Sequence, residues 1–234
     1  MDAFGLLELD VYQNPGEQLS EDQVERYTEI TQSAFTRAEP DRENVEEHVF
    51  ADTLVEARID GEAVGFSGTD YLDSKKTVLG SGMAVDPDYQ ENGIGSLIRT
   101  RGVMGDIEEG GYFAARSANP SILSHMQDQY KAFPREDLET PEAVEEAMHV
   151  AAEEIDSSRN FEAPVMENAY PEQMNEMPDH ELSDFLEELM DEKGQGYDEG
   201  DALIMAAEVS EPELQEAYDQ LVNEAEFEVR EEVM

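Results

Sequence analysis

The chain has 234 residues, 39 % of them hydrophobic, which is enough to bury one large domain or a domain with an appendage. Fifty-nine acidic residues against fourteen basic ones give a formal net charge of −45. Because such a charge repels itself in dilute buffer and is screened in molar salt, we interpret it as adaptation to a high-salt cytoplasm. The rival interpretation is an acidic DNA mimic or a disordered acidic partner, and the regular apolar periodicity argues against disorder.

Targeting signals and disulfides are not expected. No run of 18 apolar residues predicts a transmembrane helix, and the N-terminus lacks the basic and apolar regions of a signal peptide. The chain has no cysteine, which fits an intracellular protein. We therefore expect a cytoplasmic protein with no membrane partner and no nucleic-acid partner.

The first elements are a strand and two helices. Apolar and acidic residues alternate in Phe4–Val11, which predicts a strand with one buried face. Ser20 and Gln23 have the spacing of a capping box, and the helix that they begin is predicted to reach Phe35. A second short helix is predicted over Asp41–Phe50.

A meander of strands follows. Strands are predicted over Thr53–Ile59 and Ala63–Tyr71, with Asp60-Gly61 as a hairpin turn between them. A further turn leads to a third strand over Thr77–Val85, and Asp86-Pro87 ends that strand.

Helices and strands alternate in the rest of the chain. A long helix is predicted from Gly93 to Gly110-Gly111, then a strand over Tyr112–Ser117 and a helix from Asn119-Pro120 to about Ala132. After Pro134 we predict a helix capped by Thr140 with Pro141 at its first position, strands over Phe161–Asn168 and Asp201–Val209, and helices over Asp179–Asp191 and Leu214–Ala225.

This order predicts an α/β (α+β) fold with a mixed, mostly antiparallel sheet and helices on both faces. Residues 1–134 are expected to form the first domain. Residues 135–234 form an acidic C-terminal part whose strands near 161–168 and 201–209 are expected to complete the sheet. A separate acidic module is the alternative for that part.

The segment from Leu79 to Ile98 carries the chemistry, because a strand ends there, a turn follows and a helix begins at glycines. A helix N-terminus has unpaired N–H groups and about half a positive charge, and glycine lets a ligand approach the backbone. Such a site suits a pyrophosphate. A P-loop is excluded because no lysine lies between Lys76 and Lys131. The dinucleotide fingerprint fits poorly, because Ile98 stands where its third glycine is required.

The spacing of Gln90-Glu91-Asn92-Gly93-Ile94-Gly95 resembles the Gln/Arg-x-x-Gly-x-Gly/Ala signature of the GCN5-related N-acetyltransferases. Val85-Asp86-Pro87-Asp88-Tyr89 before it is similar to the end of that family's fourth strand. The motif covers about 20 residues, and the order of elements over about 130 residues matches the family's. An ordinary glycine-rich helix start is the alternative explanation.

The resemblance implies binding of acetyl-coenzyme A, with pantetheine between splayed fourth and fifth strands. We expect no metal site, because the four histidines have no ligand spacing. Met83, Ala84 and Val85 would offer main-chain groups, and an N–H near Val85 would stabilise the tetrahedral oxyanion. The pyrophosphate would lie against backbone N–H groups of the turn. The residues expected there are Gln90, Glu91, Asn92, Gly93, Ile94, Gly95 and Ser96.

Two more residues match roles in that family. Asn119 would bond the pantetheine arm, and Tyr130 would protonate the leaving thiolate. Tyr130 departs from the pattern, because it lies eleven residues after Asn119 where about seven is common; a tyrosine at the edge of the core is the alternative. The strand Leu79–Val85 lacks the acid that many relatives use as general base, so Asp70 or Asp73 is a candidate substitute.

Cations are dense after the motif, which would offset the acidic field near coenzyme A. Surface ion pairs with Glu108 and Glu109 explain the same pattern equally well. The five cations are Arg99, Arg101, Arg116, Lys131 and Arg135.

The resulting hypothesis is an N-acetyltransferase that moves an acetyl group from acetyl-coenzyme A to a small-molecule or peptide amine by direct attack. The alternative is a catalytically silent protein with the same fold, docked in an assembly or a homodimer through its C-terminal part. The four histidines are far apart in sequence, form no ligand spacing and are interpreted as surface or helix-packing residues.

Overall fold

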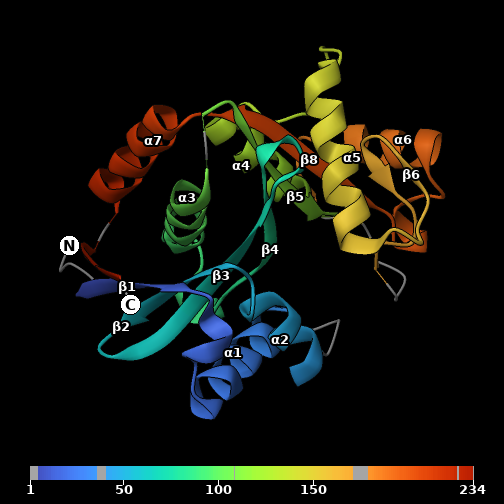
Figure 1. Ribbon diagram of the computed structural model, residues 1–234. Coiled ribbons are helices and arrows are strands. Elements are labelled where there is room, and N and C mark those ends of the chain that lie inside the picture. Colours follow the sequence, from blue (N-terminus) through green and yellow to red (C-terminus); the bar gives the residue numbers. More distant parts are fainter. Residues whose placement is uncertain (1–4, 36–40, 108, 171–178, 226, 234) are drawn as a thin grey trace. The chain divides into compact units, whose positions relative to one another are not determined.

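The computed structural model describes residues 5–35, 41–107, 109–170, 179–225 and 227–233. The chain divides into two compact units. The first unit consists of Met1–Tyr71, Gly80–Ile107 and Glu211–Met234, and the second of Leu72–Leu79 and Glu108–Ser210. Strands in a mixed sheet and flanking helices make up the fold, which confirms the predicted mixed α/β class (Figure 1).

In the first unit the strand order is β3-β2-β1-β9, and the end of β4 from Gly80 belongs to the same unit. β1 pairs antiparallel with β2, β2 pairs antiparallel with β3, and β9 runs parallel to β1. The turn between β2 and β3 is the predicted one, with Asp60 at φ 53° and Gly61 at φ 81°. The strands are β1 (Leu6–Gln13), β2 (Thr53–Ile59), β3 (Glu62–Leu72), β4 (Thr77–Val85) and β9 (Glu228–Val233).

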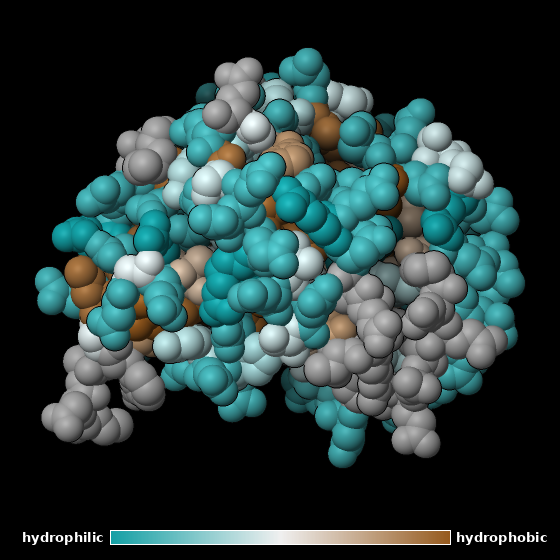
Figure 2. Space-filling view, turned by 90° about the horizontal axis from the view of Figure 1, so that it is seen from below, coloured by the Kyte–Doolittle hydropathy of each residue, from teal (hydrophilic) through white to brown (hydrophobic). Residues whose placement is uncertain are grey.

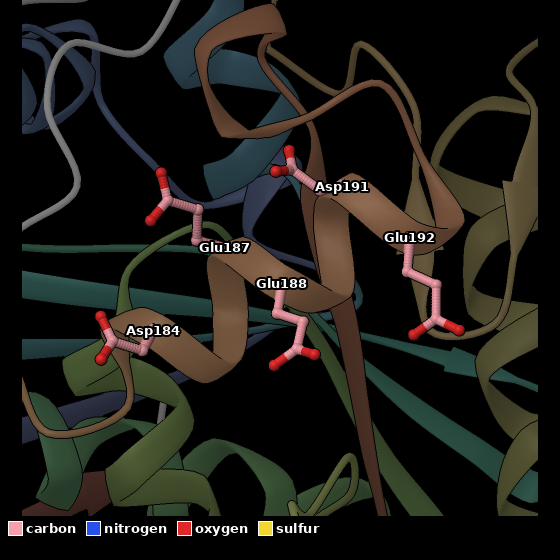
Figure 3. A pocket seen from close by; sticks show the side chains of 5 residues that line it. All are labelled: Asp184, Glu187, Glu188, Asp191 and Glu192. Atoms are coloured by element: carbon pink, nitrogen blue, oxygen red, sulfur yellow. The ribbon is translucent and has the colours of Figure 1, made fainter.

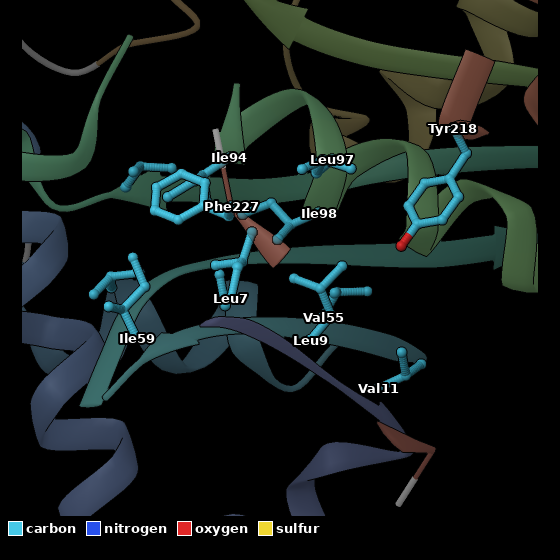
Figure 4. Close-up of a cluster of buried hydrophobic side chains, with 13 residues drawn as sticks. Leu7, Leu9, Val11, Val55, Ile59, Ile94, Leu97, Ile98, Tyr218 and Phe227 are labelled. Carbon is cyan, nitrogen blue, oxygen red and sulfur yellow. The ribbon is translucent and has the colours of Figure 1, made fainter. Parts of the chain in front are cut away.

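One face of this sheet packs against α3 (Ile94–Asp106) and α7 (Glu211–Glu224). Figure 4 shows Leu7 and Leu9 of β1 pointing toward Ile98 and Leu97 of α3, as the alternation in β1 predicts. All four of these side chains are fully buried, so this cluster fixes α3 on β1 of the sheet.

The opposite face packs against α1 (Glu21–Ala34) and α2 (Arg42–Val49). α1 begins with the predicted capping box, in which the Gln23 N–H donates to Ser20 Oγ and the Gln23 side chain accepts from the Ser20 N–H. The buried cluster on this face includes Tyr27, Phe66 and Ala84.

A buried carboxylate interrupts that apolar face. Glu56 of β2 is 1 % exposed and accepts a hydrogen bond from the Tyr27 hydroxyl. Arg58 lies 3.5 Å from Glu56 and 3.5 Å from Asp10 of β1. Burial is the main cause that raises the pKa of Glu56, and Arg58 and the Tyr27 hydrogen bond partly offset it. This cluster places charged side chains within the otherwise apolar face that α1 covers.

In the second unit the strand order is β6-β7-β8-β5, and β8 pairs antiparallel with β5 from Leu203 to Val209. α5 packs against both strands, and α6 contacts β7. The strands are β5 (Gly111–Ser117), β6 (Phe161–Glu162), β7 (Val165–Met166) and β8 (Ala202–Val209). The helices are α4 (Pro120–Tyr130), α5 (Glu142–Asp156) and α6 (Ser183–Lys193).

A fully buried carboxylate joins the loops of this unit. Asp201 accepts hydrogen bonds from the N–H groups of Asn168, Gln195 and Gly196 at 2.9, 2.6 and 2.8 Å. Its side chain is 0 % exposed. Because it accepts three backbone bonds from two segments, it fixes both loops to the start of β8.

Several predicted boundaries were wrong. The single strand over Phe161–Asn168 is two short strands, because Pro164 has no N–H and interrupts the ladder. The cap of α5 is Pro141 and not Thr140, and α3 ends at Asp106, before Gly110-Gly111. β9 was not predicted at all.

Short 3₁₀ turns complete the described elements. They are η1 (Pro15–Glu17), η2 (Ser74–Lys76), η3 (Pro87–Tyr89) and η4 (Tyr197–Glu199). The splaying of the fourth and fifth strands and the domain boundary after residue 134 stay predictions.

Figure 2 shows hydrophilic residues over most of the described part of the visible face. Within the described part of the chain, the helices are too short or too polar to cross a membrane.

Candidate functional site

The turn between β4 and α3 is fixed to the first unit by several hydrogen bonds. The Asp86 N–H donates to the Val64 carbonyl at 2.8 Å, and Arg26 pairs with the Asp86 carboxylate at 3.0 Å. The Gln90 side chain donates to the Val85 carbonyl at 2.8 Å, which holds the turn to the last residue of the strand. The start of the helix is therefore set by contacts to the sheet.

Two residues of this turn have left-handed backbone conformations, Glu91 at φ 64° and Gly93 at φ 79°. The Asn92 side chain donates to the Gln90 carbonyl at 3.0 Å. The side chains of Gln90 and Asn92 thus stabilise the turn itself. Successive N–H groups in such turns form concave anion sites.

Among the described residues, the backbone donors at the start of α3 have no acceptor. Gly93 is the N-cap, it is exposed, and no side chain caps the helix. Apart from the helix's own bonds, no described residue accepts from the N–H groups of Gly93, Ile94, Gly95 or Ser96. Unpaired donors and the helix dipole together make this end attractive to an anion.

At the candidate site, β4 can offer main-chain atoms to a ligand more readily than side chains, because its side chains here are mostly buried. Ala84 is 3 % and Val85 8 % exposed, and each belongs to a hydrophobic cluster. Ile94 is also a core residue at 1 % exposure. A Cβ on Gly95 would lie 3.5 Å from the Met83 Cε, so the helix start packs directly over Met83. Of the expected ligand-binding residues here, Ala84, Val85 and Ile94 can act only through the backbone.

Asp70, the candidate base, has both carboxylate oxygens engaged. Oδ1 accepts from the Asp52 N–H at 3.0 Å, and Oδ2 accepts from the Ser81 hydroxyl of β4. Asp52 in turn accepts from the Tyr71 N–H at 2.9 Å. Asp70 therefore ties β3, β4 and the start of β2 together.

The second unit contains Asn119 and Tyr130, at the two ends of α4. Asn119 is the N-cap and accepts from the Ser121 N–H at 2.9 Å. Tyr130 is 5 % exposed, and its ring meets Phe113 edge-on with centroids 5.2 Å apart. The candidates are thus divided, with Asp70 and Met83–Ser96 in the first unit and Asn119 and Tyr130 in the second.

The cations after the motif make mostly local contacts. Arg101 pairs with Glu231 at 2.7 Å, Arg135 donates to the Ala132 and Gln127 carbonyls, and Arg116 lies 5.2 Å from the centre of the Tyr170 ring. Arg99 is buried at 6 % exposure. The expected partner Glu108 lies outside the described residues.

A second surface feature is an open pocket on α6. Five carboxylates line it, and Figure 3 shows them pointing away from the helix axis. They belong to Asp184, Glu187, Glu188, Asp191 and Glu192. In the described part of the chain, no group of three or more His, Cys, Asp or Glu side chains is arranged to hold a metal ion.

A model of the acetyltransferase (GNAT) family matches residues 17–99, which include α1, the meander and the turn at Gly93. No curated protein matches the chain. The chain is therefore similar to this family over that segment.

Solved structures similar to this chain have low sequence identity to it. The ribosomal-protein-S18-alanine N-acetyltransferase from Escherichia coli is 16 % identical, with 86 % of this chain and 94 % of that chain covered and a TM-score of 0.47. Ard1 from Thermoplasma volcanium is 12 % identical, with 86 % and 98 % covered and a TM-score of 0.47. An aminoglycoside N-acetyltransferase in complex with CoA is 17 % identical, with 58 % and 95 % covered and a TM-score of 0.41.

Proposed function

We propose that the protein is an N-acetyltransferase that transfers the acetyl group of acetyl-coenzyme A to an amine. The amine nitrogen attacks the acetyl carbon, the carbon–sulfur bond breaks, and coenzyme A leaves as the thiolate. The observation that carries the proposal is the row of N–H groups from Gly93 to Ser96, after the turn that follows β4, for which no described residue supplies an acceptor. The family match over residues 17–99 supports it.

The residues of the first unit bind the co-substrate in this proposal. The N–H groups of the turn from Gln90 to Ser96 hold the pyrophosphate, with the side chains of Gln90 and Asn92 keeping the turn in shape. Main-chain groups of Met83, Ala84 and Val85 contact pantetheine, and one of their N–H groups polarises the thioester carbonyl.

In the second unit, Asn119 and Tyr130 stay proposals for the pantetheine arm and for protonation of the thiolate. Because Tyr130 is almost fully buried, protonating the thiolate requires its hydroxyl to reach the ligand from the core edge.

A silent binding protein of the same fold is the second candidate function, because both oxygens of Asp70, the candidate base, are engaged in hydrogen bonds. Binding of acetyl-coenzyme A without turnover of any amine would favour it.

Replacement of Gly93 by alanine tests the anion site. At φ 79° a Cβ is strained by about 1–2 kcal/mol, so the turn is expected to relax and to weaken acetyl-coenzyme A binding about tenfold. Calorimetry in molar KCl measures the affinity.

Gly61→Ala is the matched control, because Gly61 has φ 81° and, like Gly93, open space where a Cβ would stand, yet it lies in the β2–β3 turn. Both variants are expected to lose similar stability, and only Gly93→Ala is expected to lose affinity. Equal affinity in the two variants would contradict the site, and no binding by the unaltered chain would reject the proposed function.

We also propose that the protein works in a high-salt cytoplasm. Raising KCl from about 0.1 M to about 1 M shortens the Debye length from about 10 to about 3 Å, which screens the repulsion among 59 acids. The unfolding midpoint in urea is therefore expected to rise with KCl. Sucrose, which does not screen charge, is the control; an equal rise with sucrose, or none with KCl, would count against the proposal.

A further inference from the structure

The end of α2 lies unusually close to two strands of its own unit. A Cβ on Gly68 of β3 would overlap the His48 carbonyl oxygen, and a Cβ on Gly82 of β4 would lie 2.6 Å from the His48 Cγ. Real Cβ atoms do not approach other atoms this closely, so both positions require glycine. The His48 imidazole therefore lies directly against the main chain of β4.

The contact of His48 with Gly82 lies beside the residues of β4 that are proposed to bind pantetheine. Gly82 immediately precedes Met83, the first of the residues whose main chain is proposed to contact the acyl-pantetheine arm. The His48 side chain is only partly buried, so a solvent-borne amine can reach that face of the helix. Of the side chains in proteins, an imidazole is the one whose ordinary pKa is best suited to take a proton near neutral pH.

Other side chains of this unit are less suitable for taking a proton from the amine. β4 has no acidic residue between Thr77 and Val85. Asp70 is already hydrogen-bonded through both oxygens, to the Asp52 N–H and to the Ser81 hydroxyl. Glu56 is 1 % exposed beneath α1 and cannot meet an incoming amine.

We propose that His48 is the general base of the reaction, a role that rests on the proposed acetyltransferase function. As the amine nitrogen forms its bond to the acetyl carbon, its proton passes to an imidazole nitrogen of His48. The carbon–sulfur bond then breaks, the electron pair leaves on sulfur, coenzyme A departs as the thiolate, and His48 releases its proton to solvent.

The test is the rate of thiol release from acetyl-coenzyme A with a panel of amines. The panel contains a peptide with a free N-terminus, a lysine peptide, a polyamine and an aminoglycoside. A thiol reagent reads only coenzyme A in this assay, because the chain has no cysteine. His48→Ala is expected to lower kcat about 100-fold, with an unchanged affinity for acetyl-coenzyme A in calorimetry.

Imidazole added to His48→Ala is expected to restore part of the rate, whereas pyrazole, a ring of the same size and far lower basicity, is not. His149→Ala is the control, since His149 packs edge-on against Phe161 in the second unit. An unchanged kcat in His48→Ala overturns the inference, as does a loss that imidazole does not rescue or that comes with lost cofactor affinity. If the unaltered protein acetylates no amine in the panel, the proposed function fails instead.

Discussion

Replacement of Asp201 by alanine is expected to lower the free energy of unfolding by about 3 kcal/mol. The carboxylate is 0 % exposed and accepts three backbone hydrogen bonds from two segments. Alanine leaves those N–H groups without their acceptor, and each buried unpaired donor costs about 1–3 kcal/mol, part of which water recovers. Urea unfolding in molar KCl measures the loss.

Asp201→Asn is the matched control, because it keeps the size of the side chain and one acceptor oxygen. Its amide NH₂ must face at least one of the N–H groups that Asp201 now satisfies, so an intermediate loss is expected. If Asp201→Ala were as stable as the unaltered chain, the carboxylate would not be holding the two loops together.

Gly68→Ala is expected to cost about 3 kcal/mol, because the new Cβ would overlap the backbone oxygen of His48. A backbone atom cannot move aside as a flexible side chain can, so the end of α2 must shift away from β3. The same shift moves the His48 ring off Gly82, and kcat is expected to fall together with stability. Unfolding and steady-state rates on the same preparation measure both effects.

Gly102→Ala is the control for a buried glycine. A Cβ there would lie 3.4 Å or more from Thr69 and Val55, which is ordinary contact, and alanine is the better helix former within α3. Stability is expected to stay equal or to rise slightly. Losses of similar size in Gly68→Ala and Gly102→Ala would show that the approach of α2 to β3 is not specifically tight.

Elements with strong local patterns could be predicted from the sequence. The alternation around Leu7 and Leu9 identifies a strand whose apolar side must be buried, and the structure buries both residues completely. Ser20 and Gln23 determine where α1 begins, because the capping bonds need only neighbouring residues. The Asp60-Gly61 turn was predictable for the same reason, since its left-handed backbone depends on the two residues that form it.

Features that depend on distant partners were not predictable. β9 is rich in charged residues, and it forms because β1 supplies a parallel ladder and because Arg230 pairs with Glu8. The contact of His48 with Gly82 joins residues that are neighbours only in the folded chain. For the candidate site, spacing in the sequence identified the turn at Gly93, whereas the engagement of Asp70 by Asp52 and Ser81 became visible only in the structure.

The first unit is assembled from three separate stretches of chain, and its last strand lies beside its first. A ribosome that has made only residues 1–210 holds β1 without the neighbour on its outer edge and α3 without α7. The second unit, by contrast, has by then been synthesised in full. During synthesis the helix start proposed to hold coenzyme A therefore gains the support of α7 and β9 only after Glu211–Met234 has emerged.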